Sequence, residues 1–246
     1  MRIRALLCAT ALLVAGSASA ATDGLPDCPA ADGVKLAAGD YLETGYIETL
    51  HKSLSPLAAM GEGLQTGAPQ RVAVSLKGDG LQLVAGFNWH EGGWLFTLHS
   101  DGRLERDRNW GGVDTASFQV IDRCAFRLAA PNAPVRIYRY IGSDTGYVAR
   151  IVLAGSYADA QGRSYRFDAD GNAVFPGRTF RYTVELDQVL DPYDFVHVGD
   201  TKEYIAFHRD GDTLALYPVV ANPDSGGFGS PDLGHPIATL RRTTAH

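Results

Sequence analysis

An Asp-Gly dipeptide occurs four times after Gln70, each time between two segments in which apolar and polar residues alternate. The dipeptides are Asp79-Gly80, Asp101-Gly102, Asp170-Gly171 and Asp210-Gly211. Asp-Gly is typical of tight hairpin turns, because glycine accepts a positive φ angle and aspartate tolerates one. The flanking alternation indicates strands with one buried face. We therefore expect a meander of antiparallel strands.

The clearest strand is Phe180–Leu186, in which Phe180, Tyr182, Val184 and Leu186 fall on one face and polar residues on the other. Further strands are predicted at Ser117–Ile121, Val135–Ile141, Tyr147–Leu153, Leu214–Val219 and Ala238–Arg241. So many strands leave exposed edges unless the sheet curls closed. The sequence therefore predicts an all-β fold, an antiparallel meander curled into a barrel or a strongly curved sandwich.

One amphipathic helix is predicted near the N-terminus, over Tyr41–Lys52. Apolar residues recur there at a spacing of four, which is typical of a helix that packs against a sheet. Asp40 is the expected cap, with Glu43 completing a capping box, and Ser55-Pro56 is expected to end the helix.

The first 20 residues have the three regions of a secretory signal peptide: Arg2 and Arg4, the apolar run Ala5–Ala15, and small residues at Ala18-Ser19-Ala20. Residues 21–246 are then expected to form a single β domain, with a possible division into two lobes near residues 129–134. The chain has 22 basic and 28 acidic residues, a charge that does not favour nucleic acid or anionic lipid as a partner. No membrane span is expected, and the protein is predicted to be periplasmic or secreted.

Two cysteines, Cys28 and Cys124, remain after the signal peptide. In an oxidising compartment two thiols usually pair, so a structural disulfide is predicted. The alternative is a reactive or metal-binding thiol, but neither cysteine lies in a CxxC motif or beside a histidine.

The segment Gly155-Ser-Tyr157-Ala-Asp159, followed by Gly162, Tyr165-Arg-Phe167 and Asp170-Gly171, resembles the opening of lipocalin-like domains. The resemblance covers Gly155 to Val219, with Tyr157 in the place of the usual tryptophan. It implies a cup-shaped β-barrel whose first strand carries a ring that closes the bottom. It also implies that the barrel holds a small apolar ligand.

The densest polar cluster contains Asn88, His90 and Glu91. In a hydrolase His90 would be the general base, Glu91 its orienting partner or acid, and Asn88 an oxyanion donor. The simpler interpretation is a hairpin turn with a solvated glutamate, and we favour it. No cofactor motif and no set of histidines with metal-ligand spacing is present, so neither a cofactor nor a metal is predicted.

Aromatic residues are the best candidates for ligand binding, because tyrosine combines apolar area with a polar group. The candidates are Tyr157, Tyr165, Tyr182, Tyr204, Trp89 and Trp94. The alternative is that tyrosine simply packs well on sheets. We expect a non-catalytic envelope protein that binds a small apolar or amphipathic ligand. A partner-binding protein of the inhibitor or immunity type is the first alternative, and a hydrolase using His90 and Glu91 is the second.

Overall fold

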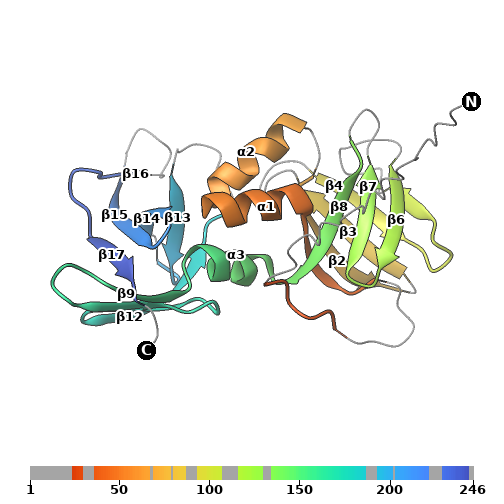
Figure 1. Cartoon of the computed structure of the whole chain (residues 1–246). Helices are drawn as coiled ribbons and strands as arrows, with labels where there is room; N and C mark the ends of the chain where they lie inside the picture. Colours follow the sequence, from red (N-terminus) through yellow and green to blue (C-terminus); the bar gives the residue numbers. More distant parts are fainter. Residues whose placement is uncertain are drawn as a thin grey trace, which may run out of the picture.

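The structure is a computed structural model of the chain. It describes residues 24–29, 36–66, 69–78, 80–86, 93–106, 116–129, 134–186, 193–201, 203–221 and 229–243. Two curled antiparallel sheets make up most of it, with helices between them (Figure 1). This arrangement confirms the predicted fold class of antiparallel β-structure curled into barrel-like shapes.

The N-terminal sheet has eight strands in the order β5-β4-β3-β2-β1-β8-β7-β6. Its strands are β1 (Gly39–Glu43), β2 (Arg71–Lys77), β3 (Gly80–Gly86), β4 (Gly93–Leu98), β5 (Leu104–Arg106), β6 (Ser117–Asp122), β7 (Ala125–Ala129) and β8 (Arg136–Gly142). Every pairing is antiparallel, and the first strand lies beside the last. One face of this sheet buries a separate apolar core around Tyr41, Phe126 and Tyr138.

The C-terminal sheet closes on itself. Its strands are β9 (Gly155–Ala158), β10 (Ser164–Phe167), β11 (Asn172–Phe175), β12 (Arg178–Val184), β13 (Asp194–Val198), β14 (Tyr204–Asp210), β15 (Thr213–Ala221), β16 (Gly229–Pro231) and β17 (Ala238–Arg242). The order is β14-β13-β12-β11-β10-β9-β17-β15-β16, and an additional β14–β15 pairing joins the ring. All strands except β16 thus form an up-and-down antiparallel barrel, which is compatible with a lipocalin-like barrel.

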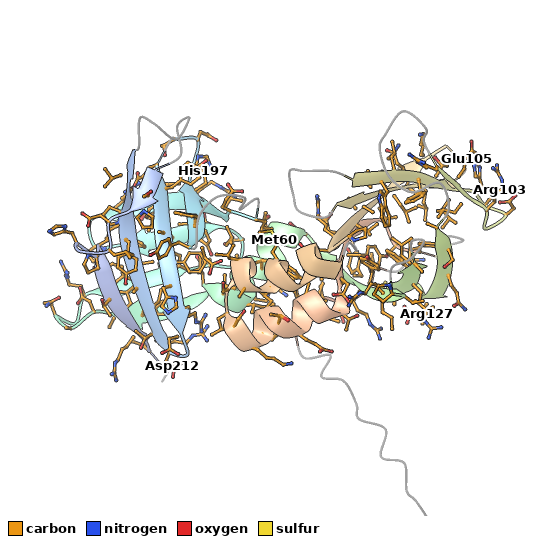
Figure 2. The ribbon with its side chains drawn as sticks, turned by 90° about the horizontal axis from the view of Figure 1, so that it is seen from above. Met60, Arg103, Glu105, Arg127, His197 and Asp212 are labelled. Atoms are coloured by element: carbon orange, nitrogen blue, oxygen red, sulfur yellow. A yellow bond between two sulfur atoms is a disulfide. The ribbon has the colours of Figure 1, made fainter. Side chains whose placement is uncertain are left out.

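Three helices occur in the described part of the chain: α1 (Thr44–Ser53), α2 (Pro56–Thr66) and α3 (Asp144–Val152). They lie between the two sheets in both views (Figures 1 and 2). Buried residues of all three helices belong to the apolar core of the C-terminal barrel, although α1 and α2 follow the first strand of the N-terminal sheet. None of these described helices is long and apolar enough to cross a bilayer.

The predicted helix is present, but its beginning is shifted and its cap is different. Residues 39–43 form β1, and the Glu43 carboxylate accepts a hydrogen bond from the backbone N–H of Tyr46 at 2.9 Å. Asp40, the expected cap, lies in the strand and pairs with Arg71 at 2.8 Å. Leu54 ends α1 in the left-handed conformation, and Pro56 then begins α2.

The prediction of a strand over Tyr147–Leu153 is wrong, because these residues fall in α3 and its C-terminal cap. Most other predicted strands are confirmed, including the alternation in β12, where Tyr182 and Val184 are buried and Arg181 and Thr183 are exposed. Three Asp-Gly hairpins are present with glycine at positive φ: Gly102, Gly171 and Gly211. In the β2–β3 hairpin Gly78 has the positive φ angle, whereas Gly80 lies in β3; Asp79 is outside the described residues.

The predicted disulfide is confirmed: Cys28 and Cys124 are bonded, with their Cα atoms 5.8 Å apart. The bond ties the segment 24–29 to the β6–β7 turn. The chain passes from the N-terminal sheet to the C-terminal barrel through α3, whereas residues 129–134 link β7 to β8 within one sheet. The single-domain prediction and the signal peptide at residues 1–20, which lies outside the described residues, both remain predictions.

Candidate functional site at the open end of the C-terminal barrel

The two ends of the C-terminal barrel differ. Helix α3 leads directly into β9, so it lies at the end where β9 begins. The β9–β10, β11–β12 and β13–β14 turns lie at the opposite end, because successive strands alternate in direction. The end beside α3 is called the closed end below, and the opposite one the open end.

Helix α3 fills the closed end. Tyr147, Val148 and Val152 are buried in the barrel core. Arg209 points inward from β14 and donates hydrogen bonds to the carbonyl oxygens of Ile151 at 3.2 Å and Val152 at 2.7 Å. A guanidinium at the C-terminus of a helix is favoured by the helix dipole and satisfies carbonyl groups that have no partner within the helix. The closed end is thus held by the protein's own side chains.

Three of the predicted ligand-binding tyrosines lie together inside this barrel. Tyr157 donates its hydroxyl hydrogen to the Leu153 carbonyl oxygen at 2.6 Å, and Tyr182 donates to that of Asp168 at 2.7 Å. Burial raises the pKa of both hydroxyls. Their polar groups are therefore used within the fold. The hydroxyl of the third, Tyr165, lies 3.3 Å from Asp159 Oδ2.

The open end presents a group of aromatic rings. Phe175 contacts Tyr165 and Phe180 with ring centroids 5.1 and 4.9 Å apart. Phe175 and Phe180 are only partly buried, whereas Tyr165 is 5% exposed. By strand alternation both phenylalanines share the inward face with the buried Ala173 and Tyr182. Partly exposed aromatic rings therefore border the core at this end.

Charged residues flank these rings. The guanidinium of Arg178 forms two hydrogen bonds to the Glu203 carboxylate, at 2.8 and 2.6 Å, and its Cζ lies 4.6 Å from the Phe180 ring centroid. The hydrogen bonds from Arg178 lower the pKa of Glu203. Asp159 accepts hydrogen bonds from the backbone N–H groups of Gln161 and Arg163 in the β9–β10 turn. The open end thus combines apolar rings with fixed ionic groups.

The other predicted ligand-binding residues are elsewhere. Tyr204 lies on the outer face of the barrel, with its ring centroid 4.9 Å from that of His197. Trp94 is buried in the core of the N-terminal sheet, next to Phe96. Trp89 is outside the described residues. The described residues that were predicted together as ligand-binding thus lie in two separate apolar cores and on the outer face of the barrel.

The candidate catalytic residues Asn88, His90 and Glu91 also lie outside the described residues. The nearby pair His99 and Glu105 is on the surface, with Nε2 and Oε2 2.9 Å apart and Arg103 sharing the same carboxylate. Figure 2 shows Arg103 and Glu105 at the end of the N-terminal sheet distant from the helices. Among the described residues, no group of three or more His, Cys, Asp or Glu side chains is arranged to hold a metal ion.

Sequence reasoning missed Phe175, Arg178 and Glu203 as members of a site. Pro176-Gly177 after Phe175 was a usable signal, because it marks a turn at the end of a strand. No local sequence signal marks the ion pair, since Arg178 and Glu203 are 25 residues apart.

No family model matches this chain, and neither a curated protein nor a solved structure matches it. The fold and the site therefore carry the functional argument by themselves.

Proposed function

We propose that this chain is an exported, non-catalytic binding protein that takes a small apolar or amphipathic ligand at the open end of its C-terminal barrel. The observation that carries the proposal is the asymmetry of that barrel. One end is filled by α3 and held by Arg209, whereas partly exposed Phe175 and Phe180 border the core at the other. A ring of eight strands is just wide enough to be filled by side chains or to hold one small ligand.

Two further features support the proposal. The up-and-down order of the barrel agrees with the resemblance of Gly155–Val219 to lipocalin-like domains. The disulfide between Cys28 and Cys124 is consistent with a location outside the cytoplasm, as is the predicted signal peptide.

Titration of the mature protein with an apolar fluorescent probe such as N-phenyl-1-naphthylamine tests this function. We expect saturable binding to the wild type, which the double variant Phe175→Ala/Phe180→Ala weakens about tenfold through lost ring contacts. Phe118→Ala is the matched control, because Phe118 is a partly buried phenylalanine on β6 of the other sheet. Probe binding that is absent, or equally reduced by the control, would count against the proposal.

A second candidate function is binding of a protein partner, which exposed apolar side chains favour. Val220 is 57% exposed, Leu233 50% and Ile237 41%. The Asp232 and Ile237 N–H groups donate to the carbonyl oxygens of Pro218 and Leu216, which places the segment between β16 and β17 beside β15. The backbone that carries Leu233 and Ile237 therefore lies beside the strand that carries Val220.

Native mass spectrometry of the protein purified from its own periplasm separates the two functions. A small bound mass supports the carrier, and a partner chain supports the alternative. If a partner is present, Val220→Asp/Ile237→Asp should release it. Leu76→Asp should not, since Leu76 is 70% exposed but lies on β2 of the other sheet.

A further inference from the structure

The ion pair between Arg178 and Glu203 crosses part of the open end. Arg178 is the first residue of β12, and Glu203 directly precedes β14. Strand β13 lies between β12 and β14 in the barrel. The pair therefore bridges two strands that are not neighbours, across the end of β13.

Arg178 is on the inward-facing side of β12, where it shares its face with Phe180 and Tyr182. Glu203 lies just before β14 and meets Arg178 through the two hydrogen bonds. The guanidinium carbon of Arg178, 4.6 Å from the centre of the Phe180 ring, makes a cation–π contact. One arginine thus contacts both the aromatic surface and a carboxylate.

The ion pair is open to solvent. The Arg178 and Glu203 side chains are 43% and 42% exposed, so a ligand from solvent can reach the guanidinium. The two parallel hydrogen bonds show that the guanidinium already presents its planar fork to a carboxylate. A second carboxylate arriving from solvent meets the same geometry.

We propose that the ligand of this site is an amphiphile with an apolar chain and a carboxylate head, and that Arg178 selects the head while Glu203 occupies its place in the empty protein. This inference rests on the proposed function, because the chain must contact Phe175 and Phe180. The whole chain carries a formal net charge of −6, so its overall charge does not attract an anion. Selection of a carboxylate must come from a local cation, and Arg178 is placed to supply it.

Dodecanoate and 1-dodecanol are suitable probes, because they share a chain and differ in the head group. Their dissociation constants are measured at pH 8, where the dodecanoate is ionised. The wild type should prefer dodecanoate. Glu203→Gln should strengthen dodecanoate binding several-fold, since the competing charge is gone, and leave dodecanol binding unchanged.

Arg178→Gln should weaken dodecanoate binding about tenfold or more, as expected for loss of hydrogen bonds to a charged group, with little effect on dodecanol. Arg181→Gln is the control, because Arg181 is exposed on the outward face of the same strand. If neither probe binds, the result contradicts the proposed function itself. If both probes bind equally well, or if Glu203→Gln leaves the preference for dodecanoate unchanged, the function stands and the role of Arg178 is refuted.

Discussion

At the scale of single residues, the first strands of the two sheets begin in the same way. Gly39 precedes Tyr41 by two positions, and Gly155 precedes Tyr157 by two. Each tyrosine hydroxyl donates to a carbonyl oxygen four residues upstream, Ala37 at 2.7 Å and Leu153 at 2.6 Å. Both glycines have positive φ, and a Cβ atom would lie 2.6 Å from the Tyr140 ring at Gly39 and 2.9 Å from the Arg242 guanidinium at Gly155. One local device therefore anchors the opening strand of each sheet.

The energetic value of this anchor is testable with Tyr157→Phe. The change leaves the buried Leu153 carbonyl oxygen without its donor, so we expect a loss of about 1–2 kcal/mol in the free energy of unfolding. Tyr217→Phe is the control, because the Tyr217 hydroxyl makes no hydrogen bond to the described residues. Urea denaturation of both variants gives the comparison. Equal stability of the two would show that the hydroxyl does not anchor the strand.

A buried acid, Asp194, makes stability depend on pH. It is 5% exposed, and its Oδ1 atom accepts the Leu57 N–H at 2.9 Å, at the beginning of α2. Burial raises its pKa to about 6, against the lowering effects of the hydrogen bonds from Ser55 and Leu57 and of the charge of His208. The folded protein therefore binds this proton more tightly than the unfolded chain does.

The Asp194 contribution should be fully present below the unfolded-state pKa of 3.8 and lost as pH rises through about 6. The loss amounts to about 3 kcal/mol. Asp194→Asn keeps the acceptor and removes the titration, so its stability should change less over this range. The free energy of unfolding measured from pH 4 to pH 8 tests this, with the exposed Asp210→Asn as control. Parallel curves for Asp194→Asn and the wild type would contradict it.

At the scale of elements, alternation and turn residues predicted strands well and helices poorly. Leu42 is spaced by four residues from Tyr46, which favours a helix, yet it lies in β1 and packs among the helices while Tyr41 packs inside the N-terminal sheet. A strand buried on both faces shows no alternation. Helix α1 ends at Ser53, just before Ser55-Pro56, as predicted, but the same proline also begins α2, which was not predicted.

Helix α3 was missed because its β-branched residues favour a strand when only local sequence is considered. Val148 and Val152 are four residues apart and both buried, so tertiary packing into the barrel end determines the helix. The Arg209 contact to its last carbonyl groups comes from β14, more than 50 residues later, and no local pattern reports it.

Arg209→Met tests whether that contact holds α3. Methionine keeps most of the volume but leaves the Ile151 and Val152 carbonyl oxygens without a donor. We expect a loss of about 2–3 kcal/mol in the free energy of unfolding. Arg241→Met, at an exposed position on β17, should change stability by less than about 0.5 kcal/mol. Thermal unfolding followed by circular dichroism measures the stability of both variants. Equal unfolding midpoints for the two would show that Arg209 does not hold α3.

At the scale of the whole molecule, the hairpin signals predicted one class of fold without predicting how many sheets it forms. Asp-Gly dipeptides lie between paired strands in both the N-terminal sheet and the C-terminal barrel, so the dipeptide does not distinguish the two sheets. The candidate site was predicted in part for the same reason. Tyr165, one of the predicted ligand-binding residues, lies at the open end, but the neighbouring Arg178 and Glu203 are brought together only by barrel closure.

The disulfide acts at this largest scale, because Cys28 and Cys124 are 96 residues apart and the closed loop contains most of the N-terminal sheet. In the loop-entropy description such a bond stabilises the folded chain by about 3–5 kcal/mol. The strands of the C-terminal barrel lie outside the loop, although α1 and α2, whose buried residues join the barrel core, lie within it. Cys28→Ser/Cys124→Ser should therefore lower the stability of the N-terminal sheet more than that of the barrel.

Hydrogen exchange followed by mass spectrometry distinguishes the two sheets in this double variant, with faster exchange expected in β6 and β7 and little change in β12 and β13. The unreduced, denatured wild type should show no free thiol. Two titratable thiols, or equal loss of protection in both sheets, would contradict this role of the bond.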